Sequence, residues 1–511
     1  MNSRPNHFFP FYVSSNFIMS ILSLFFLANC SKDDFKPTVH DYSDYEFEEP
    51  TVTGNTYYID PVNGSSEGNG SITNPWRTLQ EVIESDLICY YRHTENNNPE
   101  SSLEIVNENA PVKGGDRIVL KSGYHGYVSR NNFIFNDWLT IEGEGNAVLS
   151  QFRLEGAFAK VYLKKVTISK ESYIGTENFW EADVINRNNN ACVYLASSDF
   201  WGKGSDIKLK DLTLRTVLNS DLWTADDWVE KSANGISIRG VPNTEIVNCA
   251  LTSVSFGISI SDNSTDCIVV GNTIRNYSGD GARLNSDGTY FAYNIITDCY
   301  KVDGNHDDAI QSFTFGDDGC VGTGVIRNVI IRSNLIIGTT NFENSLAGSP
   351  QGIGCFDGFF ENWKVENNVI IVNHYHGITF YGMRRGIIAH NTVIDQVPGN
   401  DISPWIMITD HKNGTPSESC LMANNIAFRS VSAEGVGVEE ENNFIIGREN
   451  YSLLNELFVN PDEFDLHLLD NATTFEVIID AGIKYSDVVS TLWDCENKER
   501  DDHPDLGAYE Y

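Results

Sequence analysis

A dense group of proton-handling side chains lies between residues 299 and 312, directly before the alternating apolar pattern of a strand. The group offers a base, a cation, carboxylates and an amide within one turn of chain, which suits general acid–base chemistry. Asp, Asn and Gly also favour solvated turns, so the stretch gains meaning only from its place in a repeat. Its chemistry-bearing members are Lys301, Asp303, His306, Asp307, Asp308 and Gln311.

Asparagines recur before short apolar or β-branched pairs through the later half of the chain. A period near 23 residues with insertions is typical of a solenoid, in which each coil contacts only its neighbours. A buried Asn can hydrogen-bond the coils above and below, which predicts a structural ladder. The expected members are Asn248, Asn272, Asn294, Asn334, Asn368, Asn391 and Asn425, at separations of 24, 22, 40, 34, 23 and 34 residues.

A second column of motifs, at Asn234, Phe256, Asp280, Asp308, Gln351, His376 and Pro404, has a residue followed by Gly, Ala or Trp and then Ile or Ala. Strand alternation sends the Ile or Ala inward, and parallel strands stack about 4.8 Å apart. The motif therefore predicts that Asp280, Asp308, Gln351 and His376 form one exposed row on successive coils. The next row holds Arg283, Gln311 and Thr379, with Tyr381 beside it, and His306 and His374 lie two positions before the column. Insertions at 313–328 and 339–350 are expected to wall a groove there.

The composition is strongly acidic, with Lys+Arg 35 against Asp+Glu 71 and a net charge of -36 over 511 residues. Such a chain repels nucleic acid and anionic membranes, so nucleic-acid binding is not expected. An anionic sugar stays possible, because a local Arg, His or Ca²⁺ reverses the sign inside a groove. Ten cysteines are spread singly, which does not indicate a disulfide framework or a zinc site. Cys249, Cys267 and Cys299 are expected to be buried as small apolar residues.

The N-terminus carries a short apolar run from Phe17 to Ala28 that ends at Asn29 and Cys30. The run suits a secretory signal, and Leu-Ala-Asn-Cys resembles a bacterial lipoprotein signal with Cys30 as the lipidated residue. This resemblance implies a place in the bacterial cell envelope, with membrane attachment only through the lipid at Cys30. The chain itself is expected to be a monomer. We therefore expect a signal peptide over 1–30, a flexible acidic tether over 31–53 and one domain over 54–511.

The opening of that domain reads as a strand at 57–61, a short helix at 75–83 and a first coil at 116–123. It resembles the N-terminal cap of secreted right-handed parallel β-helix proteins of the pectin-lyase type, and residues 505–511 resemble their C-terminal strand. The expected fold is all-β, a right-handed parallel β-helix with an N-terminal helical cap.

Residues 280–412 resemble those of bacterial β-helix proteins that act by β-elimination on uronic-acid glycans, with ulvan-type substrates favoured. The resemblance implies an acidic polysaccharide or oligosaccharide partner and a lyase or chain-end dehydratase, between which the sequence does not distinguish. Elimination needs a base, a proton donor and a group that neutralises the uronate carboxylate. The catalytic candidates are Lys301, His306, Asp308, His374, His376 and Tyr381. The substrate-binding candidates are Arg283, Gln311, Gln351, Tyr375, Trp405, His411 and Lys412, and Asp303 and Asp307 are candidates for binding Ca²⁺.

Three alternatives remain open at this stage. An inverting hydrolase could use Asp280 and Asp308, one coil apart. The adjacent Asp307 and Asp308 resemble the tandem aspartates of polygalacturonases, although the matching Asn-Thr-Asp and Arg-Ile-Lys motifs are missing. A C5-epimerase shares the first step of elimination, and a non-catalytic glycan-binding β-helix would bind without turnover.

Overall fold

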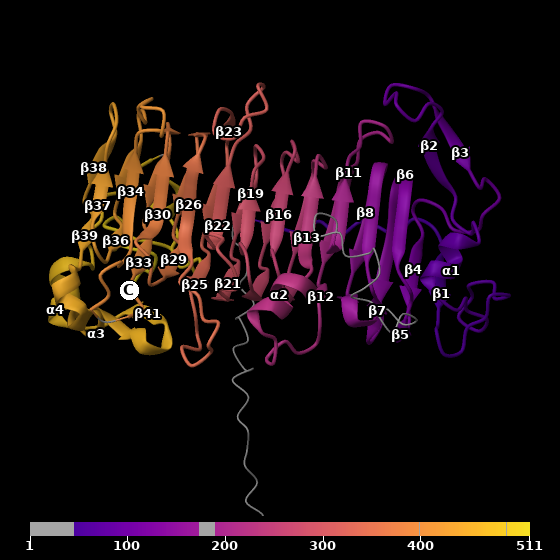
Figure 1. Ribbon diagram of the computed structural model, residues 1–511, viewed down its shortest axis with the longest axis horizontal. Helices are drawn as coiled ribbons and strands as arrows, with labels where there is room; N and C mark the ends of the chain where they lie inside the picture. The colour runs from indigo at the N-terminus through magenta and orange to yellow at the C-terminus, as the bar shows by residue number, and fades with distance from the viewer. Residues whose placement is uncertain (1–44, 173–189, 398, 487) are drawn as a thin grey trace, which may run out of the picture. The chain divides into compact units, whose positions relative to one another are not determined.

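Short parallel strands repeat along the chain in the computed structural model, which describes residues 45–172, 190–397, 399–486 and 488–511. Each strand pairs in parallel with strands one coil earlier and one coil later, so that Ile236 lies beside Ile258 and Ile258 beside Ala282. Figure 1 shows the strands following one another in chain order, from indigo to yellow. The predicted parallel β-solenoid is confirmed.

The strands form three stacks. The first contains β10 (Ala191–Ala196), β13 (Asn234–Arg239), β16 (Ile258–Ser261), β19 (Ala282–Leu284), β22 (Asp308–Phe313), β26 (Gln351–Asp357), β30 (His376–Tyr381), β34 (Trp405–Thr409) and β37 (Val431–Ala433). The second contains β1 (Thr56–Ile59), β4 (Arg117–Leu120), β11 (Ser205–Lys210), β14 (Thr244–Val247), β17 (Ile268–Val270), β20 (Tyr290–Ala292), β24 (Ile330–Arg332), β28 (Lys364–Glu366), β32 (Ile387–Ala389), β35 (Leu421–Ala423) and β38 (Glu439–Glu441). Long strands β6 (Val128–Gly143) and β8 (Phe152–Lys164) join these two stacks, because β8 pairs with both β10 and β11.

The third stack contains β5 (Gly123–Tyr124), β7 (Ala147–Leu149), β9 (Thr167–Ser169), β12 (Thr213–Arg215), β15 (Ala250–Val254), β18 (Thr273–Tyr277), β21 (Ile295–Cys299), β25 (Leu335–Ile337), β29 (Val369–Ile371), β33 (Thr392–Ile394), β36 (Ile426–Ala427) and β39 (Phe444–Ile445). A smaller sheet is formed by β23 (Val325–Arg327), β27 (Phe359–Glu361) and β31 (Met383–Arg384). The inward sides of the three stacks form one continuous apolar core. The inward column of the first stack is buried throughout, as alternation predicts: Ile236, Ile258, Ala282, Ile310, Ile353, Ile378 and Ile406.

The asparagine ladder is present, with one change of membership. The side-chain amide of Asn334 donates to Asn368 Oδ1 at 2.9 Å and its carbonyl oxygen accepts from Asn294 Nδ2 at 3.0 Å. Asn248 is not a rung, because the Cys249 N–H donates to Asn272 and so occupies the first position. The rungs are Asn272, Asn294, Asn334, Asn368, Asn391, Asn425 and, beyond the expected set, Asn443. The buried state predicted for Cys249, Cys267 and Cys299 is confirmed.

The ends of the solenoid are covered by irregular structure and short helices. Helix α1 (Leu79–Glu84) is the expected N-terminal cap, and a hairpin of β2 (Tyr90–His93) and β3 (Leu103–Val106) follows it. The C-terminal part contains α3 (Leu454–Leu457), α4 (Ala472–Val477), β40 (Phe458–Asn460) and β41 (Asp465–Leu468). The strand predicted at 505–511 is wrong, because this segment is irregular and the Gly507 N–H bonds to the Asn424 carbonyl.

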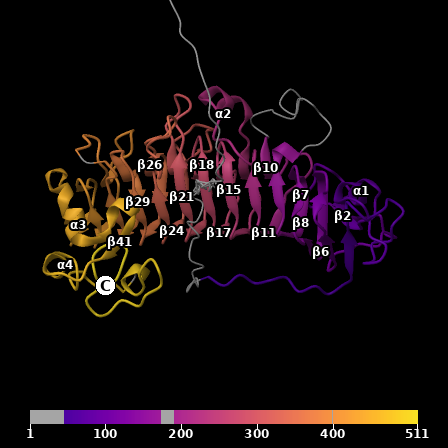
Figure 2. The same ribbon diagram turned by 90° about the horizontal axis from the view of Figure 1, so that it is seen from below.

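Residues 45–53, expected to belong to a flexible tether, lie against the second stack. Glu49 pairs with Lys210 at 2.9 Å and accepts from the Tyr162 hydroxyl at 2.8 Å, and the Phe47 ring lies 4.3 Å from Lys210 Nζ. Figure 2 shows this indigo segment running alongside the strands. These contacts of Glu49 and Phe47 hold the segment against the strands, although its acidic composition predicts a solvated tether. The predicted signal peptide, Cys30 and residues 31–44 lie outside the described residues. Within the described ranges no helix is long and apolar enough to cross a membrane.

Candidate active site

The predicted row of Asp280, Asp308, Gln351 and His376, here called the site row, runs across successive coils of the first stack. Asp308 pairs in register with Gln351, and the Asp308 N–H donates to Asp280 Oδ1 at 3.0 Å. The alignment is therefore confirmed, but the predicted exposure is wrong. All four side chains are at least nine-tenths buried, because each stands at the bend that opens a strand and packs against the neighbouring coil.

The upstream half of the row holds an arginine against the sheet. Arg283 Nε lies 2.5 Å from Asp280 Oδ2, and its guanidinium lies 4.1 Å from the centre of the Phe256 ring. Gln311, which is paired with Arg283 in register, donates its amide to Asp308 Oδ2 at 2.8 Å. Arg283 and Gln311 are thus the partly exposed members, and the two buried carboxylates orient them. This group of Asp280, Arg283, Asp308 and Gln311 is called the arginine cluster below.

Burial and mutual repulsion act on the two carboxylates. Burial raises the pKa of Asp308 well above its usual value, and the charge of Asp280 raises it further. The pKa of Asp280 is also raised by burial, although Arg283 opposes that shift. Asp308 Oδ1 and Gln351 Oε1 are buried without a hydrogen-bond partner among the described residues. A protonated Asp308 could donate a hydrogen bond here, whereas an ionised carboxylate can only accept.

The downstream half of the row leads into an aromatic group, called the histidine cluster: His374, Tyr375, His376 and Trp405. The rings of His374 and His376 are stacked with centres 5.5 Å apart, and the Trp405 ring meets His376 edge-on at 5.3 Å. Tyr375 packs on Trp405 at 5.0 Å. His306, in the turn before β22, lies within electrostatic range of this group, because its charge acts on both other imidazoles.

Hydrogen bonds orient two of these imidazoles. His374 Nδ1 accepts the backbone N–H of His376 at 3.2 Å, so a neutral His374 carries its proton on Nε2. His376 Nδ1 bonds the Thr379 hydroxyl at 2.9 Å, and the same hydroxyl accepts from Trp405 Nε1 at 3.0 Å. Burial, with the charge of His306, lowers the pKa of His374 to about 4. Burial and the neighbouring histidines lower that of His376 to about 3, so both rings are uncharged at neutral pH.

The turn at 301–307 uses its own charges internally. Lys301 pairs with Asp307 Oδ2 at 3.1 Å, and Asp303 Oδ1 accepts the Asn305 N–H at 2.8 Å. Burial raises the pKa of Asp307 to about 6, while Lys301 opposes that shift. No group of three or more His, Cys, Asp and Glu side chains in the described ranges could hold a metal ion. Calcium binding by Asp303 and Asp307 stays a prediction, and no step below is routed through a metal ion.

Three further candidates lie beside the histidine cluster rather than in it. Tyr381 packs edge-on against Phe356 at 5.4 Å, and Phe356 lies 4.7 Å from the His376 ring. His411 is buried and stacks on Phe359 at 4.5 Å. Lys412 pairs with Asp357 at 2.8 Å.

Arg429, which sequence reasoning missed, lies with its guanidinium 5.0 Å from the centre of the Trp405 ring. It stands in the turn before β37, on the coil after Trp405, and none of the described acidic residues forms an ion pair with it. The motif column stops at Pro404 in the sequence, because the next coil lacks the Gly-Ile pattern. Extending the motif column by one coil beyond Pro404 leads to Arg429, because Ile406 pairs with Val431.

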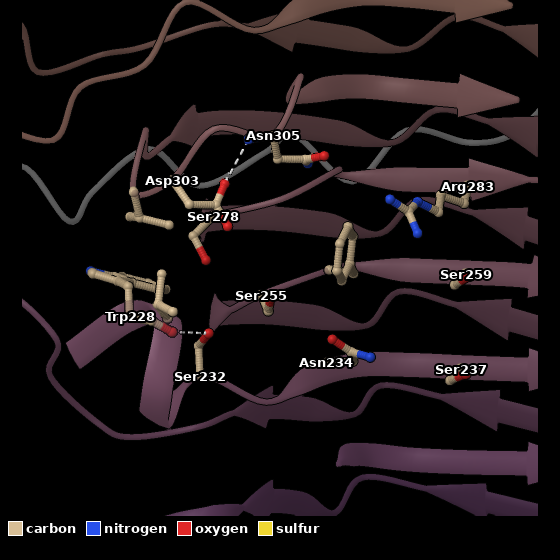
Figure 3. A pocket seen from close by; sticks show the side chains of 13 residues that line it. Trp228, Ser232, Asn234, Ser237, Ser255, Ser259, Ser278, Arg283, Asp303 and Asn305 are labelled. Carbon is tan, nitrogen blue, oxygen red and sulfur yellow. Dashed lines mark hydrogen bonds between the residues drawn. The ribbon is translucent and has the colours of Figure 1, made fainter. Parts of the chain in front are cut away.

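A cavity of about 400 Å³ opens beside Arg283, on the upstream part of the first stack. Figure 3 shows small polar side chains from β13 and β16 on its floor, with α2 (Ala225–Lys231) on one side and the 302–305 turn on another. Of the predicted site residues, Arg283 and Asp303 line it. The insertion at 339–350 supports the turn, because the Lys301 N–H bonds to the Leu346 carbonyl.

Comparisons with known proteins agree with this architecture. Residues 234–415 match the family model described as a right handed beta helix region. The fold is therefore a right-handed parallel β-helix, and the matched segment contains both clusters. No curated protein matches the chain.

Among solved structures, the chain is similar to the pectate lyase Pel9A, with 16% identity, a TM-score of 0.41 and coverage of 90% of this chain and 97% of that one. It is similar to XylC in complex with xylose at 9% identity and a TM-score of 0.43, covering 89% and 98%. A rhamnogalacturonan lyase aligns at 13% identity and a TM-score of 0.37, covering 76% and 87%. At these values the likenesses carry no argument about activity, which is inferred from the site alone.

Proposed function

We propose that this protein is a carbon–oxygen lyase that performs β-elimination on a uronic-acid glycan, with ulvan-type chains favoured as substrate. The observation that carries the proposal is the histidine cluster, in which the uncharged imidazoles of His374 and His376 pack against Tyr375 and Trp405. An imidazole must be uncharged to accept a proton, and aromatic faces commonly contact sugar rings. Arg429, which forms no ion pair with the acidic residues that the structure describes, lies beside Trp405 and supplies a cation for a carboxylate.

In this proposal His376 is the base. Its Nδ1–H donates to the Thr379 hydroxyl oxygen, which leaves the unprotonated Nε2 to take the proton α to the uronate carboxylate. The Nε2–H of neutral His374 donates to the oxygen that leaves from C4 or to the carboxylate. Arg429 neutralises the carboxylate, which makes its α-proton more acidic. A bound carboxylate also favours protonated imidazole, so substrate binding raises the low pKa of His376 toward the working range.

The arginine cluster binds a different sugar of the same chain. Arg283, Gln311, Gly354 and Thr379 are successive register partners, so Arg283 lies roughly 14 Å from Thr379 at the usual strand spacing. That separation is too long for Arg283 and the histidine cluster to contact the same sugar ring. Arg283 and Gln311 are therefore assigned to a neighbouring carboxylate along the glycan.

The buried aspartates argue against the hydrolase. An inverting hydrolase places a water between carboxyl groups about 6.5–9.5 Å apart. Asp280 instead accepts the N–H of Asp308, and both side chains are almost fully buried. Their geometry suits positioning of Arg283 and Gln311.

The test is incubation of the full chain with alginate, pectin, ulvan and glycosaminoglycan polymers and oligomers, while the ultraviolet band of unsaturated uronates is followed. We expect a rise on at least one substrate. His376→Ala should lower that rate by about 10²–10⁴-fold, the usual contribution of a general base. The matched control is His503→Ala, at an exposed histidine outside both clusters.

Other outcomes identify other enzymes. New reducing ends without the band would contradict elimination and support hydrolysis. Proton exchange at C5 without unsaturation would identify an epimerase. Products of polymer and oligomer digestion, separated by size, distinguish internal cleavage from loss of a chain-end hydroxyl. Comparison of His306→Ala with His376→Ala tests which histidine is the base.

A further inference from the structure

The cavity beside Arg283 is lined by neutral polar side chains that the protein itself leaves unused. The side chains of Asn234, Ser237, Ser255 and Ser259 line it and form no hydrogen bond with any described residue. All four are partly exposed. Hydroxyl and amide groups of this kind both donate and accept, as sugar hydroxyls do.

The positions of these residues follow from the coil register. Ser237, Ser259 and Arg283 are successive partners on β13, β16 and β19, so two small side chains precede a long one on the same face. This change in size creates the hollow and ends it at the guanidinium. Figure 3 shows Ser237, Ser259 and Arg283 in one line, with Asn234 and Ser255 further into the cavity.

The charges of the residues that line the cavity favour an uncharged sugar over an anionic one. Its one cation, Arg283, is already held by Asp280, and the carboxylate of Asp303 stands on the opposite wall. A second carboxylate or a sulfate inside the cavity would lose hydration without gaining a cation. An uncharged sugar meets no such cost, and the half-buried Phe256 ring offers it an apolar face.

We propose that this cavity is a subsite for an uncharged sugar that neighbours the uronate bound by Arg283. The assignment rests on the proposed function and narrows its substrate class. The substrate glycan therefore carries an uncharged, unsulfated sugar next to the uronate that Arg283 binds. The cavity's volume of about 400 Å³ lies within the usual range for small-ligand sites.

The test is a binding measurement on the full chain, by saturation-transfer NMR and calorimetry. The probes are the methyl glycosides of glucose, xylose and rhamnose, glucose 6-sulfate and methyl glucuronide. We expect at least one uncharged glycoside to bind. Ser259→Leu should weaken it by about tenfold or more, equivalent to about 1.4 kcal/mol, because the new side chain fills the cavity. Methyl glucuronide should instead depend on Arg283→Gln.

The matched control is Ser261→Leu, on the same strand but outside the cavity. The subsite is overturned if no uncharged glycoside binds, if Ser259→Leu and Ser261→Leu act alike, or if glucose 6-sulfate binds as tightly as the uncharged glucoside. These readouts do not require elimination. A chain that binds the glycosides without producing the ultraviolet band contradicts the proposed function alone, and the reverse result contradicts the subsite alone.

Discussion

Two rows of buried polar side chains cross the coils of this β-helix: the asparagine ladder from Asn272 to Asn443, and the site row from Asp280 to His376. In the ladder each amide donates to the next rung and to a backbone carbonyl, as Asn334 does to Asn368 and Phe291. In the site row Asp308 Oδ1 and Gln351 Oε1 have no partner within the described ranges.

The difference concerns where the hydrogen-bonding capacity is used. A buried polar group without a partner costs about 1–3 kcal/mol. The ladder avoids that cost and so acts as structure. The site row bears this free-energy cost at Asp308 and Gln351. It also contains carboxylates and an imidazole whose uncharged forms are favoured by burial. Rows of this second kind are candidates for function, because unmet capacity and shifted pKa values are what a reaction uses.

The largest expected effect breaks the ladder. Asn334→Ala removes the acceptor of Asn294 and the donor of Asn368 and Phe291, leaving several buried groups without partners. We expect the free energy of unfolding to fall by about 4 kcal/mol or more. Urea denaturation measures this loss. Because asparagine does not titrate, the loss of unfolding free energy should be equal at acidic and neutral pH. A loss that depends on pH would contradict the distinction drawn between the ladder and the site row.

Next in size is the loss of the cation held by the site row. Arg283→Gln keeps a hydrogen-bonding side chain but removes the charge, and charged hydrogen bonds contribute about 1.5–3 kcal/mol. We expect KM for the uronate substrate to rise by about tenfold or more with kcat nearly unchanged, because Arg283 binds a sugar remote from the reaction. A fall in kcat alone would place Arg283 at the reacting sugar.

A smaller effect is expected at Thr379, which positions two rings of the histidine cluster. Thr379→Val removes the partner of His376 Nδ1 and Trp405 Nε1. We expect kcat to fall by about tenfold, equivalent to about 1.4 kcal/mol. Thr379→Ser should restore the rate, since it returns the hydroxyl. Equal activity of the Val and Ser variants would show that this hydroxyl does not orient His376.

The smallest expected effect concerns stability and pH. The raised pKa of Asp308 stabilises the fold below its unfolded value near 4, and that contribution is lost as pH rises through the folded pKa. Asp308→Asn mimics the protonated form and should unfold like wild type near pH 4. At pH 8 it should be more stable than wild type, because the asparagine side chain carries no charge to bury. Parallel stability curves for the two proteins would mean that Asp308 is ionised without cost.

Much of the frame was predictable because solenoid patterns are local. The Ile and Ala of each motif proved inward-facing, and six of the seven predicted asparagines are rungs. Asn248 failed because pattern matching cannot distinguish a rung from the residue before it, which here has φ +53. The exposure of the site row was mispredicted for a related reason: alternation describes the middle of a strand, and these residues stand at a bend.

What the sequence determined by itself is the coil repeat and the residues that recur on it, since one short apolar pattern specifies each step of a solenoid. The tertiary structure decided which side chains meet across coils. It buried Asp280 and Asp308, packed His376 against His374 and Trp405, and placed Arg429 beside Trp405. Those contacts depend on loop lengths and turn geometry between coils, which sum over many residues and leave no local signature.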